Sequence, residues 1–164
     1  MHEPYFEKYL RRVVPVEDPI EQLASQGEGF LAWAKSISTS ETKLTHPPYT
    51  WTLGEVLKHL SDCERVFAFR ALWLARGSKE PLPSFDENLF LENSAARTTP
   101  WEDLIAEYES VRLASITLFK SLPSDAWTNR GTAAGFDVDV NMLYGMIYGH
   151  LDHHFSIMKK RVSK

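Results

Sequence analysis

The feature that most constrains the fold is a long run of apolar residues at helical spacing over residues 52–76. It opens on a capping box, in which the Thr52 hydroxyl accepts from a first-turn amide and the Glu55 carboxylate accepts from the Thr52 amide. Gly77 suits the position after the last turn. Within the stripe only Glu64 is polar; its apolar members are Leu53, Val56, Leu57, Leu60, Phe67, Ala71 and Leu74. The pattern predicts an amphipathic helix with one face buried.

Three further segments show the same periodicity. Asp18-Pro19 is a good N-cap and first helical residue for a helix that runs to about residue 37. Residues 99–102 form a second capping box, opening a helix that Pro123 stops. A last helix runs from about residue 139 to residue 161. Four such helices predict an all-α four-helix bundle, and the length predicts one domain over residues 1–164.

The segments between these helices differ in character. Residues 1–16 fit either a short leading helix or an arm packed on the body, and residues 38–50 and 130–136 read as loops. The connection over residues 77–99 is long for a compact domain, which is typical of functional segments. We expect it to contain a short helix and to be able to cover one end of a site.

Composition excludes several classes of function. The 164 residues are 43% hydrophobic and 24% charged, as in an ordinary globular protein, and the net charge of -4 disfavours a nucleic-acid-binding surface. The single cysteine, Cys63, allows no internal disulfide and fits a reducing compartment. The sequence shows neither a membrane-spanning apolar run nor a signal-peptide pattern. We therefore expect a cytoplasmic protein with no nucleic-acid or membrane partner.

Three histidines have the spacing of a metal site. His150 and His154 are four residues apart in the apolar stripe of the last helix, so they lie one turn apart on one face. His59 lies at the edge of the buried face of the 52–76 helix. Three imidazoles on inward faces can hold one divalent ion and leave a coordination position for water or substrate. Zinc and nickel are favoured, although iron and copper also suit such ligands. The same residues could instead be ordinary core histidines.

The segments that carry these histidines resemble a known family. Residues 52–65 (TLGEVLKHLSDCER) and 149–154 (GHLDHH) are similar to the two signatures of the DinB/YfiT-like superfamily. The resemblance implies a four-helix bundle with His59, His150 and His154 as metal ligands, and a homodimer. It also implies a thiol-dependent transferase, such as those that use bacillithiol or mycothiol, or a maleylpyruvate isomerase. A low-molecular-weight thiol or a small-molecule electrophile would then be the partner. An ion in the three-histidine site that activates water would instead make the protein a hydrolase.

Other residues near this pattern carry open alternatives. Asp62 could act as the catalytic base, orient His59 or hold a metal-bound water, or it could be an ordinary salt-bridged residue. His153 fits a surface, interface or supporting role better than ligation. Arg70 could meet an anionic substrate or pair with a carboxylate, and Cys63 reads as a small buried residue. The competing functions are a non-catalytic, stress-related bundle that binds a metal or another ligand, and a scaffold without metal.

Overall fold

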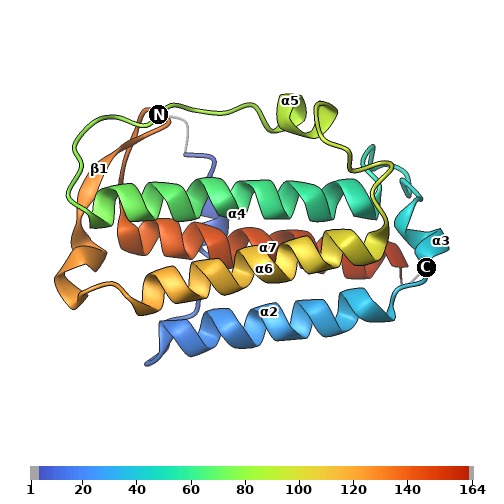
Figure 1. Ribbon diagram of the computed structural model, residues 1–164, viewed down its shortest axis with the longest axis horizontal. Coiled ribbons are helices and arrows are strands. Elements are labelled where there is room, and N and C mark those ends of the chain that lie inside the picture. The colour runs from blue at the N-terminus through green and yellow to red at the C-terminus, as the bar shows by residue number, and fades with distance from the viewer. Residues whose placement is uncertain (1–3, 163–164) are drawn as a thin grey trace.

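The structure is a computed structural model that describes residues 4–162. Its long helices form a bundle (Figure 1), and they are α2 (Pro19–Ser36), α4 (Leu53–Ala75), α6 (Trp101–Lys120) and α7 (Val140–Val162). Helix α4 packs against both α6 and α7, and α2 packs against α6. The four-helix bundle predicted from the apolar spacing is therefore confirmed.

The long connection after α4 sets the topology of the bundle. It returns along the bundle, so α4 and α6 run in the same direction while α2 and α7 run in the opposite one (Figure 1). The connection contains the expected short helix, α5 (Glu87–Glu92), whose N-cap Asp86 accepts hydrogen bonds from the amides of Asn88 and Leu89.

Helix starts follow the capping predictions in two cases out of three. The Asp18 carboxylate accepts from two first-turn amides of α2, and Thr52 and Glu55 form the predicted capping box of α4. The second predicted capping box is wrong. Helix α6 has Pro100 as its N-cap, and the Thr99 hydroxyl donates to the Ala95 carbonyl instead.

The prediction of a loop over residues 130–136 is also wrong. After the short 3₁₀ helix η1 (Ser124–Thr128), strands β1 (Arg130–Ala133) and β2 (Phe136–Asp139) form an antiparallel hairpin. Ala134 and Gly135 both have positive φ (53° and 82°), as a two-residue hairpin turn of the primed type requires. Leu82 of the long connection pairs with this hairpin, since its amide donates to Thr132 and its carbonyl accepts from Ala134.

The segment before α2 combines the two alternatives expected from the sequence, a short leading helix and an arm packed on the bundle. It contains a short helix, α1 (Glu7–Leu10), and α1 packs on α7. Another short helix, α3 (Thr39–Thr42), lies within the predicted loop after α2. Within residues 4–162, no helix combines the length and apolar character needed to span a membrane.

Two clusters of buried apolar side chains fill the bundle, and polar side chains lie where they meet. One cluster includes residues from the first half of α7, such as Leu143 and Ile147, and the other includes Leu151 and Met158 from its second half. His150 lies between these two sets on α7. On α4, Glu64 is buried and explains the polar break in the predicted apolar stripe.

Glu64 is neutralised by a buried arginine. Both of its carboxylate oxygens accept from Arg112 at 2.9 Å, and the Arg112 guanidinium also donates to the Tyr108 hydroxyl at 2.7 Å. Gly27 of α2 makes room for this arrangement, because a Cβ there would lie 2.9 Å from the Arg112 Cγ. Glu64, the polar residue in the apolar stripe of α4, is therefore one partner of a buried ion pair, and Gly27 of α2 leaves the space that its partner Arg112 occupies.

Candidate metal centre

Helix α4 places His59 inside the bundle. The capping box at Thr52 fixes where the helix begins, and the neighbouring Leu57 and Leu60 are buried against the core. His59 lies on the same side and is only 6% exposed. The Trp51 ring, at the start of the helix, packs beside it with a centroid distance of 5.0 Å.

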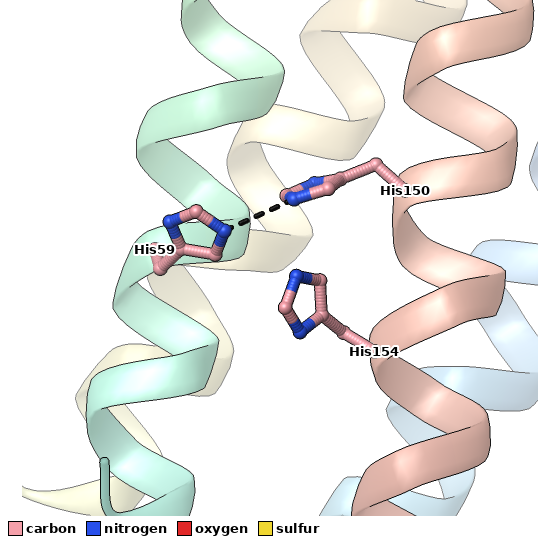
Figure 2. A group of neighbouring side chains, drawn as sticks. All are labelled: His59, His150 and His154. Carbon is pink, nitrogen blue, oxygen red and sulfur yellow. Dashed lines mark hydrogen bonds between the residues drawn. The ribbon is translucent and has the colours of Figure 1, made fainter. Parts of the chain in front are cut away.

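Helix α7 contributes the other two histidines from one face. His150 is 4% exposed and His154 is partly buried, and their ring centroids are 4.6 Å apart because one helical turn separates them. Figure 2 shows both rings pointing from α7 toward His59 on α4. The structure thus brings together the three histidines that the sequence singled out.

The distances within the group are short. The Nε2 atoms of His59 and His150 are 3.0 Å apart, and potential ligand atoms of all three histidines lie within 4.8 Å of one another. The His59 ring centroid is 4.8 Å from that of His150 and 5.0 Å from that of His154.

Burial favours the neutral form of these imidazoles. It lowers the pKa of His59 to about 4 and lowers the pKa of His150 well below the usual range for histidine. The pKa of His154 is also lowered, first by burial and then by His59. Neutral imidazole is the form that binds a metal, so the three side chains are in the ligand state at neutral pH.

The group fits a single divalent ion. Two imidazole nitrogens at about 2.0–2.1 Å from one ion lie about 2.9 Å apart at a right angle and about 3.4 Å apart at the tetrahedral angle. The 3.0 Å between His59 and His150 falls in this range, whereas the group as a whole spans up to 4.8 Å, so the three nitrogens would draw closer together around an ion. A hydrogen bond between one protonated and one unprotonated nitrogen also accounts for that distance, and the position of His154 one helical turn from His150 then adds the third nitrogen donor on the same side.

The N-terminal segment covers one side of the group. The Tyr9 ring lies edge-on to His150 at 5.1 Å and near His153 at 5.6 Å. Gly149 allows this contact, because a Cβ at that position would lie 2.0 Å from the Tyr9 carbonyl oxygen. The ion pair between Arg12 and Asp152, at 2.6 Å, fastens the same segment to α7.

A cavity of about 270 Å³ reaches the histidine group. His150, Cys63 and Arg70 line it, so one of the three histidines faces open space. The remaining lining is mainly aromatic and comes from the N-terminal segment, α4, the long connection and the hairpin: Tyr5, Tyr9, Phe67, Phe85 and Phe136. The 77–99 connection therefore forms part of the cavity.

The other singled-out residues lie outside the histidine group. Asp62 pairs with Lys58 at 3.8 Å and with Arg65 at 3.3 Å, and within the described part of the chain it makes no hydrogen bond to His59. These contacts match the salt-bridged alternative and give no support to the predicted catalytic role of Asp62. His153 is partly exposed beside His154.

Cys63 is buried, as predicted, and lies next to the group. Its Sγ is 3.5 Å from Nδ1 of His59, and the residue is 2% exposed. Burial, followed by the nearby Glu87 carboxylate, raises the pKa of the Cys63 thiol. The protonated thiol is a poor nucleophile, which is consistent with a packing role.

Sequence reasoning did not identify the residues that close the cavity. Tyr9 belongs to a segment with no clear pattern, and Phe85 and Phe136 are aromatic residues in segments read as irregular. The signal that could have found them is weak: small Gly145 and Gly149 lie one turn apart on an otherwise apolar helix, which favours close approach by another backbone.

Fold and site together define a class of protein: a helical bundle with an inward-facing group of three histidines on two helices, suited to a metal ion. The sequence over residues 22–158 matches the family model of the DinB superfamily, and the chain belongs to that superfamily. No curated protein matches the sequence.

Solved structures show the same fold. YfiT from Bacillus subtilis, described as a probable metal-dependent hydrolase with an unusual four-helix bundle topology, matches with a TM-score of 0.77 at 16% identity. The match covers 99% of this chain and 94% of YfiT. A mycothiol-dependent maleylpyruvate isomerase matches with a TM-score of 0.73 at 15% identity, over 94% of this chain and 62% of the isomerase. At these identities the likeness establishes the fold.

Proposed function

We propose that this protein is a metal-dependent enzyme in which His59, His150 and His154 hold one divalent transition ion, zinc or nickel. The reaction class is hydrolysis, or transfer of a low-molecular-weight thiol to a small electrophile. The observation that carries the proposal is the cavity beside the group. Structural sites enclose the ion in four protein ligands, whereas catalytic sites combine three with an open position.

The bound ion would lower the pKa of a water or thiol placed on it, or polarise a substrate carbonyl. The chain's own residues supply the remaining conditions. The α4 and α7 backbones hold the three imidazoles in fixed positions, and burial keeps them neutral. The role of Asp62 as catalytic base or orienting carboxylate stays a prediction, and its contacts with Lys58 and Arg65 favour the salt-bridged alternative.

The structural relatives are compatible with both reaction classes, the first through its description as a hydrolase and the second only through its dependence on a thiol. One structural relative is described as a probable metal-dependent hydrolase and another as mycothiol-dependent, and neither exceeds 16% identity to this chain. The homodimer and the cytoplasmic location expected from the sequence remain predictions that accompany this proposal.

Metal content tests the proposal first. Protein purified without an affinity tag should contain about one equivalent of a transition metal by mass spectrometry. A His59→Ala, His150→Ala double variant should contain none, while a His153→Ala control on the same helix should retain it. If wild type lacks metal and zinc and nickel both leave its melting temperature unchanged, the proposal is wrong.

Turnover tests the reaction class. Metal-loaded wild type is assayed with amide and ester substrates and, separately, with thiols and electrophiles, with the double variant as the blank. Hydrolysis without added thiol identifies a hydrolase, and strict dependence on thiol identifies a transferase. Failure of a metal-loaded protein in both assays would favour the non-catalytic metal-binding alternative.

A further inference from the structure

The cavity beside the histidine group contains a buried positive charge that the proposed chemistry leaves unused. Arg70 lies on α4, is 3% exposed and lines the cavity. Its Nη2 donates to the Pro83 carbonyl at 2.7 Å, and its guanidinium lies 5.7 Å from the centroid of the Phe85 ring. Among residues 4–162 no carboxylate lies within ion-pairing distance of Arg70.

The two other buried arginines of the described chain provide a comparison. Arg112 has a bidentate carboxylate partner in Glu64. Arg161 donates from Nη2 to the carbonyls of Leu44, Thr45 and Trp51. Arg70 has one carbonyl partner, from Pro83, and, unlike Arg112, no carboxylate among the described residues.

A buried charge without a counter-charge is costly, and a guanidinium binds a carboxylate through two parallel hydrogen bonds. The only carboxylate among the cavity residues belongs to Glu87, which is exposed and makes no ion pair with Arg70 within the described chain. The aromatic lining suits an apolar body next to the charged end of a ligand.

We propose that Arg70 binds the carboxylate of a small substrate whose apolar body fills the aromatic cavity between Arg70 and the histidine group. The inference rests on the proposed function in taking this cavity as the substrate site. It adds the substrate class: small carboxylic acids with an apolar body. The cavity volume of about 270 Å³ admits a molecule of the size of a substituted benzoate or a short thiol acid.

Benzoate and benzamide provide the test, since they differ in charge and share their shape. Their affinities are measured by calorimetry on the full chain, in zinc-loaded and in metal-stripped form. Metal-stripped protein should bind benzoate at least about tenfold more tightly than benzamide, because the charge-assisted hydrogen bonds exist only with the anion. This form separates Arg70 from any carboxylate binding by the metal.

Variants then assign the preference to Arg70. Arg70→Gln should remove the preference for benzoate and leave benzamide affinity unchanged, and Arg70→Lys should retain part of it. Arg65→Gln, which removes a charge from the half-exposed side of the same helix, should have no effect. If Arg70→Gln weakens both probes alike, Arg70 only supports the Pro83 segment and the proposal is wrong.

Two further results would also overturn it: equal affinity of wild type for benzoate and benzamide, or no binding of benzoate at all. Absence of metal from the purified protein, together with no response of its melting temperature to zinc or nickel, would refute the proposed function but not this inference, because the affinity ratio in metal-stripped protein does not depend on the ion.

Discussion

Replacing Gly149 with alanine tests how the N-terminal segment covers the site. A Cβ at this position would lie 2.0 Å from the oxygen, 2.6 Å from the carbon and 2.9 Å from the Cα of Tyr9. These are backbone atoms, so no side-chain rotation relieves the contact. The segment must move from α7 by more than about 1 Å, which is enough to disrupt close packing.

The cost follows from what the segment buries. Phe6 is 3% exposed and Tyr9 is 8% exposed, and burial of each such side chain contributes about 1.5–3 kcal/mol. Alanine returns about 1 kcal/mol through its higher helix propensity. We therefore expect Gly149→Ala to lower the free energy of unfolding by about 2–5 kcal/mol, or the melting temperature by about 5–15 °C.

Thermal denaturation followed by circular dichroism gives the measurement, and tryptic cleavage after Arg12 reports release of the segment. Gly29→Ala is the matched control, because nothing lies within 4 Å of a Cβ there. That variant should gain about 0.5–1 kcal/mol. If Gly149→Ala melts at or above the wild-type temperature and resists trypsin equally, the described packing of α1 on α7 is wrong.

Three other perturbations have defined outcomes. In metal-free protein, the pKa values of His59 and His150 are lowered, so below about pH 6.5 the unfolded chain binds more protons than the folded one. The free energy of unfolding should therefore decrease as the pH is lowered below about 6.5, by up to about 1.4 kcal/mol per pH unit for each histidine. Urea titrations at several pH values measure this slope, and His150→Gln should make it smaller. An unchanged slope in His150→Gln would contradict the argument that burial lowers the pKa of His150. Glu64→Leu should cost about 3–5 kcal/mol by leaving Arg112 buried without its partner, and adding Arg112→Met should recover most of it, as denaturant titration will show. Zinc at a hundredfold excess over its dissociation constant should stabilise wild type by about 2.7 kcal/mol and leave the His59→Ala, His150→Ala variant unchanged in thermal denaturation.

The helices and the histidine group were predictable because their signals are local. The capping box at Thr52 and the apolar period place His59 on the buried side of α4, and a four-residue spacing places His150 above His154 on α7. Once both faces point inward, a bundle brings them together. The prediction of a second capping box was wrong because α6 begins one residue later than expected, with Pro100 instead of Thr99 at the N-cap position.

Features that depend on distant partners were not predictable. The β1–β2 hairpin turns on Ala134-Gly135 rather than a strong turn pair such as Asn-Gly, and its pairing with Leu82 joins segments about fifty residues apart along the chain. The role of Gly149 depends on the backbone of Tyr9, and Glu64 in a core stripe reads as a defect until Arg112 is placed beside it. In each case the sequence shows the exception but not the contact that explains it.

The division of the cavity between helices and irregular segments has a consequence for the substrate. Arg70 and His150 both line the cavity and are both carried by helices packed in the core, so the guanidinium and the histidine group are held in fixed positions. The aromatic lining comes largely from the N-terminal segment, the long connection and the hairpin. A ligand that reaches both groups gains a charge-assisted contact and an approach to the histidines at once, whereas a ligand lacking its carboxylate retains only the aromatic contacts. Orientation toward the histidines, rather than affinity alone, should therefore depend on Arg70.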